Sequence, residues 1–318
     1  MSMVRWTVLL SVMILSFRAN AAPVAPLHVI KPFKRVVTGL AFSPDNKLLA
    51  ASFDDNTLRL IDVAKGTELA KFGVSGARNT LRFTADGNRL LAITNGGVVS
   101  IDVQAQTVKH TFRSETPGGV TSIDISPDGK FLAAVGRSSL SLWNIETGVN
   151  VATVDAHSGN AVNGVAFSPD GEHLATVGND KKLVTWSTTT VQQQKEFDLS
   201  SKGVCICYLR NGESLIIAED NRKIFAVNAS SGDEELLLSA GGSVLSMAVS
   251  PDSPVAILSG TGSFPGVLLI DKKRLSTEKF AGHKSIVQAV AVSRDGRFFA
   301  SGDNDGAINV YATLDADR

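Results

Sequence analysis

Apolar and polar residues alternate along most of the chain in short runs, and turns rich in Gly, Pro, Asn and Asp separate these runs. Val162 to Phe167, His173 to Val177 and Leu183 to Trp186 are three such runs in succession. Alternation with a period of two predicts β-strands, because successive side chains of a strand point to opposite faces. No segment after the N-terminal stretch sustains a 3.6-residue period, so the pattern predicts an all-β protein.

The same order of strands and turns recurs about every 42 residues. A tetrapeptide of the type Phe-Ser-Pro-Asp follows the first strand of each copy, and its fourth residue lies at positions 45, 86, 128, 170, 211, 252 and 295. Pro presets φ and the following Gly accepts a positive φ, so the tetrapeptide predicts a tight turn. A second strand, a polar turn, a third strand and a weaker fourth strand follow, the last as in Val149 to Val154.

This repeat resembles that of the WD-repeat family in its period, its Phe-Ser-Pro-Asp-Gly turn and the Trp or Ile that ends the third strand. The resemblance covers about residues 26–312 and implies a seven-bladed β-propeller of four-stranded antiparallel blades. It also implies a buried polar tetrad in the fourth copy, formed by His157, Thr176, Asp180 and Trp186. The seventh copy retains His283, Ser301 and Asp305, with Tyr311 in place of Trp. The other copies depart from this pattern, so we expect them to depend mainly on apolar packing.

The seventh copy lacks a fourth strand, because the residues after Tyr311 show no strand pattern. An open edge in one blade would leave backbone groups without partners. Leu27 to Phe33 lies directly before the first copy, and we predict that a strand at about 26–33 completes blade seven. Pro32 suits an outer edge strand, which can lack one donor. We therefore expect the propeller to span residues 22–318.

The N-terminus has the features of an export signal. Arg5 is followed by an uncharged stretch from Trp6 to Phe17, and Ala19-Asn20-Ala21 has the form of a cleavage site. The stretch is too short to span a bilayer. We expect residues 1–21 to be a signal peptide and the protein to enter the secretory pathway, as a secreted or periplasmic protein. A disordered tail or a buried strand is the alternative, and it implies a cytoplasmic protein.

Composition narrows the class of partner. Lys and Arg number 31 and Asp and Glu number 31, so no net field favours nucleic acid or a charged membrane surface. Later apolar segments are short and interrupted, so we expect no stable membrane insertion. The two cysteines, Cys205 and Cys207, are spaced as on one face of a strand, about 6.6 Å apart. We interpret them as small buried hydrophobic residues and not as a disulfide or a metal pair.

The sequence contains no catalytic motif that we recognise, and we expect no enzyme activity, cofactor or metal. Gly260 to Gly266 joins two strands, so it is a longer turn with Phe264 at its tip and not a phosphate loop. A lactonase-like propeller hydrolase is an alternative function. Such an enzyme needs acidic groups at the channel, and Asp124 is the only carboxylate in the first strands, which face it.

The favoured function is a non-catalytic scaffold that binds a protein or peptide on its loop face, acting as a monomer within a complex. An intracellular scaffold of the trafficking exchange-factor type is a further alternative, if the N-terminus is not a cleaved signal. The loops before each first strand and after each second strand suit protein recognition, since they present Arg, Asn and an occasional Phe. The candidate residues are Arg78, Asn79, Arg113, Arg137, Asn160, Lys181, Arg222, Phe264, Lys284 and Asn304.

Overall fold

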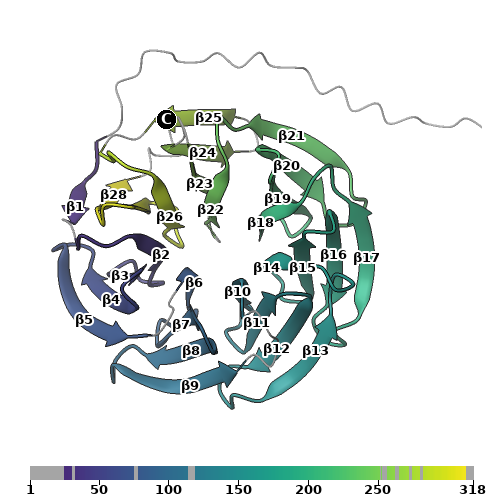
Figure 1. The fold of residues 1–318 in the computed structure, drawn as a ribbon, viewed down its shortest axis with the longest axis horizontal. Coiled ribbons are helices and arrows are strands. Elements are labelled where there is room, and N and C mark those ends of the chain that lie inside the picture. Colours follow the sequence, from purple (N-terminus) through teal and green to yellow (C-terminus); the bar gives the residue numbers. More distant parts are fainter. Residues whose placement is uncertain are drawn as a thin grey trace, which may run out of the picture.

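The computed structural model describes residues 25–30, 33–74, 78–113, 119–250, 252, 256–261, 265–271, 274–279 and 282–312. Every regular element in these ranges is a β-strand, which confirms the all-β class. No helix capable of crossing a membrane occurs in this part of the chain. The strands pair into seven four-stranded antiparallel sheets. Figure 1 shows these sheets, the blades of a propeller, arranged around a central axis with the first strand of each blade innermost.

The strands are numbered in chain order, and each blade is named here by its position along the chain. Blade one comprises β2 (Val37–Phe42), β3 (Leu48–Phe53), β4 (Thr57–Asp62) and β5 (Thr67–Gly73). Blade two comprises β6 (Arg78–Phe83), β7 (Arg89–Thr94), β8 (Gly97–Asp102) and β9 (Thr107–Arg113). Blade three comprises β10 (Ser122–Ile125), β11 (Phe131–Gly136), β12 (Ser139–Asn144) and β13 (Asn150–Asp155).

Blade four comprises β14 (Val162–Phe167), β15 (His173–Gly178), β16 (Lys182–Ser187) and β17 (Gln193–Asp198). Blade five comprises β18 (Gly203–Tyr208), β19 (Ser214–Glu219), β20 (Lys223–Asn228) and β21 (Glu234–Ser239). Blade six comprises β22 (Val244–Val249), β23 (Ala256–Gly260), β24 (Pro265–Asp271) and β25 (Arg274–Lys279). Blade seven comprises β26 (Val287–Val292), β27 (Phe298–Asp303), β28 (Ile308–Ala312) and β1 (His28–Ile30).

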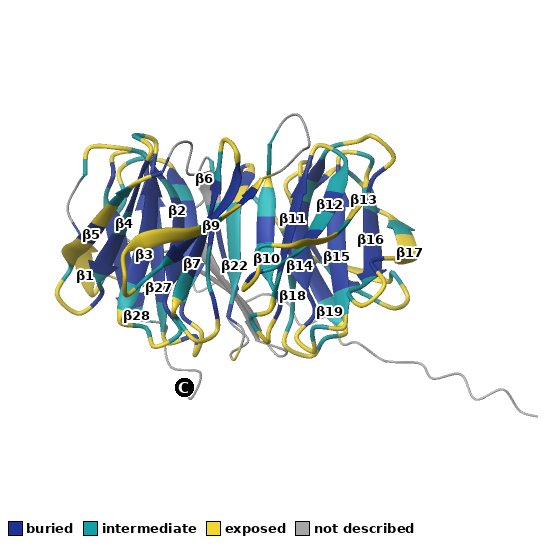
Figure 2. Cartoon of the chain, turned by 90° about the horizontal axis from the view of Figure 1, so that it is seen from below, coloured by how far each residue is buried: buried dark blue, intermediate teal, exposed yellow. Residues whose placement is uncertain are grey.

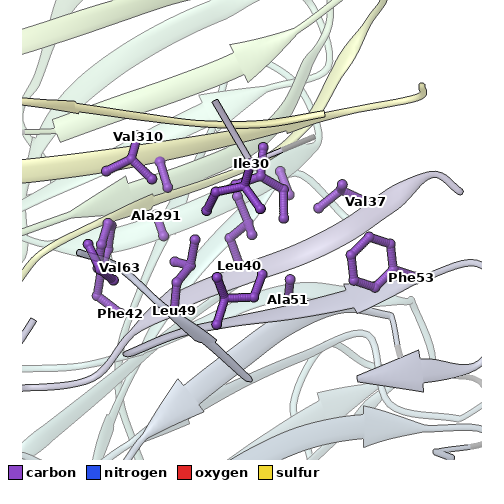
Figure 3. Packing of buried hydrophobic residues seen from close by; sticks show 14 residues of the cluster. Ile30, Val37, Leu40, Phe42, Leu49, Ala51, Phe53, Val63, Ala291 and Val310 are labelled. Carbon is purple, nitrogen blue, oxygen red and sulfur yellow. The ribbon is translucent and has the colours of Figure 1, made fainter. Parts of the chain in front are cut away.

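Blade seven is completed by the N-terminal strand, as the sequence predicts. His28, Val29 and Ile30 pair with Val310, Asn309 and Ile308 in antiparallel register. The strand is shorter than the predicted 26–33, and Pro32 lies outside the described residues. Ile30 is buried in a cluster that joins blades seven and one, together with Val37, Phe53 and Val310 (Figure 3). The two ends of the described chain are therefore held together by both backbone pairing and apolar contact.

Burial varies systematically from the inner to the outer strand of a blade. The second strands β11, β15 and β27 are buried at every position but their first. The outer strands β13 and β17 are mostly exposed. Both faces of a second strand are covered because each blade packs against two neighbours, which explains its almost continuous apolar sequence. The outer strand has little to bury, so its sequence pattern is weak.

The recurring Ser-Pro-Asp-Gly turn is stabilised by its own side chains. In blade four, Ser168 donates its hydroxyl hydrogen to Asp170, and Asp170 accepts the backbone N–H of Glu172. The Ser168 hydroxyl also accepts the N–H of His173, and Gly171 adopts φ of +75°. The same bonds recur at Ser43, Ser126 and Ser293. Asx and Ser turns of this kind require Ser or Thr, Asp and a left-handed residue, which explains why the tetrapeptide recurs.

Candidate binding surface

Two rims of loops border the ring of blades, and exposed residues concentrate on both (Figure 2). We define the upper rim as the loops that lead from one blade into the next, together with the loops between second and third strands. The lower rim holds the Ser-Pro-Asp-Gly turns and the turns between third and fourth strands. The polar tetrads and the predicted partner-binding residues whose side chains the structure describes belong to the upper rim or lie directly beneath it.

The structure brings the four residues of the blade-four tetrad into contact. His157 Nδ1 lies 2.8 Å from Asp180 Oδ1, and His157 Nε2 lies 2.9 Å from Thr176 Oγ1. Trp186 Nε1 donates to Thr176 Oγ1 over 3.0 Å. A carboxylate only accepts and an indole N–H only donates, so Nδ1 carries the imidazole proton and the Thr176 hydroxyl donates to Nε2. The chain of bonds fixes the loop that enters blade four to the two strands below it.

Blade seven holds a similar group, but its carboxylate is not the predicted one. His283 Nδ1 lies 2.7 Å from Asp303 Oδ2, and His283 Nε2 lies 2.6 Å from Ser301 Oγ. Asp303 is buried, whereas Asp305 is exposed and contributes its backbone N–H to Asp303. The assignment of Asp305 is therefore wrong. Asp303 lies two residues after Ser301 on β27, so both side chains share one face of that strand.

Tyr311 occupies the place of the tryptophan in blade seven. It is fully buried, and its ring stacks on Phe299 with centroids 4.5 Å apart. Asn309 Nδ2 donates to the Tyr311 hydroxyl over 3.1 Å, and burial raises the pKa of this phenol. Burial by itself would raise the pKa of Asp303. Hydrogen bonds from His283 and two backbone N–H groups outweigh this effect and lower the pKa of the carboxyl group.

Blade five has a polar anchor that the sequence analysis missed. Glu219 ends β19 and is buried, and it accepts hydrogen bonds from the backbone N–H and the hydroxyl of Ser200. Asn221 Nδ2 donates to the same carboxylate over 2.7 Å. Glu219 occupies the repeat position of Gly178 and Asp303, at the end of the second strand. A carboxylate at this position in two copies is the sequence signal that would have identified both acids.

Blade one uses a cation in place of a tetrad. The Arg59 guanidinium lies 4.3 Å from the ring centroid of Phe33 and 4.9 Å from that of Phe53. It also forms ion pairs with Asp55 and Glu68. Arg59 is thus held by two aromatic faces and two carboxylates, which is a favourable environment for a planar cation. Phe33 precedes β2, so this contact fixes the loop that enters blade one.

Five of the predicted partner-binding residues are exposed on the upper rim: Arg113, Arg137, Lys181, Arg222 and Lys284. Asn160 is also exposed, but its amide donates to the backbone oxygen of His157 and stabilises its own loop. Asn304 is half-buried, and its backbone N–H bonds to Ile286. Arg78 and Asn79 lie in β6, and their side chains are outside the described structure, as is the whole of Phe264.

The innermost strands carry one charged pair that links three blades. Arg82 Nε of blade two donates to Asp124 Oδ1 of blade three over 3.0 Å. Asp124 Oδ2 accepts the backbone N–H of Phe167 in blade four over 2.9 Å. Both carboxylate oxygens are occupied by structural bonds, so Asp124 is poorly placed to act as a general base.

The two cysteines lie on β18, opposite Ala218 and Ile216 of β19, and both are free thiols. They are partly exposed and not fully buried as predicted. Their surroundings nevertheless raise the pKa of each thiol to about 12 through desolvation. A protonated thiol is a weak nucleophile and a weak metal ligand, which agrees with the interpretation of Cys205 and Cys207 as packing residues.

One group of possible metal ligands occurs among the described residues, on the lower rim. Oxygen or nitrogen atoms of Asp170, Glu172 and His173 lie within 4.8 Å of one another. Asp170 and Glu172 are exposed, and Asp170 is already engaged in the Ser168 turn. His173 Nδ1 bonds to Gln194 over 3.0 Å. The group is explained by the turn and by a surface hydrogen bond, and we assign it no metal.

Together these features define a class: a closed β-propeller whose blades are four-stranded and whose entry loops are anchored by buried polar groups. Comparison with known proteins agrees with this class. The family described as "WD domain, G-beta repeat" matches residues 106–144, 148–187 and 273–311, and the "Anaphase-promoting complex subunit 4 WD40 domain" matches residues 13–85. The chain belongs to the WD-repeat family.

Individual relatives are distant. The chain is 25% identical to apoptotic protease-activating factor 1 of Rattus norvegicus over 286 residues, which is 85% of this chain and 22% of that protein. It is 27% identical over 150 residues to an uncharacterized WD repeat-containing protein of Synechocystis, covering 45% of this chain and 41% of the relative. WD repeat-containing protein SL1-17 of Schistosoma mansoni is 33% identical over 97 residues, which is 30% of this chain and 32% of the relative. The chain thus spans less than half the length of each of these relatives.

Proposed function

We propose that this protein is a non-catalytic interaction scaffold that binds a protein or peptide partner on its upper rim. The observation that carries the proposal is the way the rim is built. His157, Glu219 and His283 fix three entry loops to the blades through buried or partly buried hydrogen bonds, while the loop tips stay exposed. Loops that are ordered before binding lose little conformational entropy when a partner docks, which favours affinity.

A hydrolase function has less support from the channel. Such an enzyme needs a carboxylate, a histidine or a metal that is free to act at the channel. The carboxylate of Asp124 is engaged by Arg82 and by a backbone N–H, and the thiols of Cys205 and Cys207 are protonated at neutral pH. These bonds and pKa values favour a structural role for the polar groups of the channel.

We further propose that the protein is exported. The support is the basic Arg5, the uncharged stretch from Trp6 to Phe17 and the small-residue motif at Ala19 to Ala21, all of which precede the described propeller. Intact-mass measurement of the protein from its native host tests this proposal. A mass that starts at Ala22 in a secreted or periplasmic fraction is expected, and a full-length mass in the cytosol would contradict export.

Site-specific photo-crosslinking in the native host tests the binding face. A photoreactive amino acid would replace Ser158 or Lys284 on the upper rim, and Glu213 or Ser230 on the lower rim; all four are exposed. We expect crosslinks to a discrete protein from the upper positions and not from the lower ones. Crosslinks confined to the lower rim, or none at all, would overturn the proposal.

A further inference from the structure

The two rims differ in how their basic side chains are paired. On the lower rim, Lys47, Lys65 and Lys130 each form an ion pair with an aspartate of the same turn. Three arginines of the lower rim are also paired: Arg89 with Glu146, Arg294 with Asp252 and Arg297 with Asp295. Arg210 is the exception and donates to the backbone oxygen of Asp252. Most of the basic side chains that the structure describes on the lower rim are therefore paired within the protein.

The upper rim shows the opposite arrangement in blades three to five. Arg137, Lys181, Lys202, Arg222 and Lys223 are exposed, and none of them forms an ion pair with a described residue. We call these five residues the basic arc. Lys182, at the start of β16, is the nearby exception, since it pairs with Glu196 and Asp198.

Acidic residues beside the basic arc are engaged in bonds that stabilise the loops. Asp180 bonds to His157, and Glu219 and Asp220 accept hydroxyl groups of Ser200 and Ser201. Asp155 accepts the backbone N–H of Gly159. These carboxylates are held by the loops, and none of them forms an ion pair with a side chain of the basic arc in the described part of the chain.

Backbone conformation gives a second, independent indication. Lys181 and Arg222 have φ of +63° and +70°, and each stands 11 residues after the last residue of its copy's turn tetrapeptide. At the same repeat position blade one has Asn56 and blade seven has Gly306, which tolerate a left-handed backbone best. Arg137 adopts φ of +40° in the shorter turn of blade three. Three consecutive blades thus keep a basic residue where Asn or Gly would suit the backbone better, and such strain is typical of functional positions.

We propose that the basic arc binds an acidic segment of the protein partner. The inference rests on the proposed scaffold function and specifies the chemistry of the partner. Opposite charge across the interface would guide association and fix the orientation of the partner. A protein segment fits better than nucleic acid, because no large aromatic side chain is exposed in the described part of the chain to stack on bases.

The test is a substitution that removes charge and relieves the backbone. In the triple variant Arg137→Asn, Lys181→Asn, Arg222→Asn, each site receives the residue that blade one uses at Asn56. The matched control, Lys47→Asn, Lys130→Asn, Arg297→Asn, removes the same charge from the lower rim. The probe is a fluorescein-labelled 12-residue peptide of alternating Glu and Ser, titrated by anisotropy at low and at physiological salt.

We expect the upper-rim variant to bind the acidic peptide at least tenfold more weakly than the wild type, and the control to bind within twofold of it. The melting temperature of the upper-rim variant should equal or exceed that of the wild type, so lost binding would not reflect unfolding. Equal weakening in both variants would overturn the proposal. So would equal binding of a Lys-Ser peptide, or tighter binding of a single-stranded oligonucleotide or of phosphatidylserine vesicles at physiological salt.

Crosslinking separates failure of this inference from failure of the scaffold function. If the upper-rim variant still crosslinks to its partner through Ser158 as strongly as the wild type, the scaffold function stands and the basic arc is not the binding element. If the wild type itself gives no crosslinks from the upper rim, the scaffold function fails. Loss of the crosslink in the upper-rim variant alone, together with loss of acidic-peptide binding, supports both.

Discussion

Thr176→Val is the substitution that examines the blade-four tetrad most directly. The two side chains have almost the same shape, so the change removes the hydroxyl with little change in volume. Thr176 is fully buried, and its hydroxyl lies 2.9 Å from His157 Nε2 and 3.0 Å from Trp186 Nε1. The variant would leave the imidazole Nε2 and the indole N–H without a partner, in a place from which water is excluded.

The magnitude follows from those two groups. A buried polar group left unpaired costs about 1–3 kcal/mol, so two such groups predict a loss of about 2–6 kcal/mol of unfolding free energy. For a chain of this length about 1 kcal/mol shifts the melting temperature by about 2 °C, so the transition should fall by roughly 4–12 °C. Differential scanning calorimetry and urea titration would measure both quantities. Thr107→Val, at an exposed position of β9, is the matched control and should change the stability by less than about 0.5 kcal/mol.

A double-substitution cycle sharpens this prediction. Trp186→Phe removes the indole N–H, so Thr176→Val made in that background leaves only the imidazole unpaired. The loss of stability caused by the valine should then be about half of its value in the wild-type background. The reasoning would be refuted if the valine variant melted together with the Thr107→Val control, or if its cost were the same in both backgrounds.

Three further predictions concern acid sensitivity, thiol reactivity and ring closure. Hydrogen bonds that outweigh burial lower the pKa of Asp303, so its contribution to stability is present above about pH 4 and is lost as the pH falls further. Asp303→Asn should therefore reduce the loss of unfolding free energy between pH 4 and lower pH, measured by urea titration, and Asp305→Asn should leave that loss unchanged. Desolvation raises the pKa of both β18 thiols to about 12, so they should react with Ellman's reagent at about pH 8 only after denaturation; rapid reaction of the native protein would contradict this. Ile30→Ala should cost about 2–4 kcal/mol in urea titration, whereas Val29→Ala, at an exposed position of the same strand, should be nearly neutral; equal effects would show that β1 does not seal the ring.

The repeat in the sequence predicted the strands well because its recurring residues are those that form the turns between strands. Ser168 and Asp170 make bonds within their own turn, so their spacing reports local structure directly. The position of the blade-seven acid was predicted wrongly because counting along the repeat assumes that each loop uses the same residue. Asp305 occupies the repeat position that corresponds to Asp180. Asp303, however, lies on the same strand face as Ser301 and is the carboxylate that bonds to the His283 imidazole.

Contacts between blades were harder to predict from the sequence. Arg82 and Asp124 occupy the same place in successive copies, 42 residues apart, and they meet only because the ring sets equivalent positions of neighbouring blades side by side. The Arg59 cluster also depends on closure, because Phe33 enters from the segment between β1 and β2. A pattern within one copy holds no information on such pairs, although a comparison of equivalent positions between neighbouring copies could have suggested the first.

Anchoring of the entry loops and decoration of the loop tips involve different residues in this propeller. Loops are fixed by a histidine tetrad in blade four, by Glu219 in blade five and by a histidine with Asp303 in blade seven, all beneath the rim. The tips carry residues such as Lys181 and Arg222, whose side chains form no ion pair with a described residue and whose backbone conformation favours Asn or Gly. Neighbouring blades fix their entry loops with different buried groups. These anchors therefore stabilise the fold and leave the residue types at the loop tips unconstrained. Substitutions at the anchors should therefore lower stability, and substitutions at the tips should change binding alone.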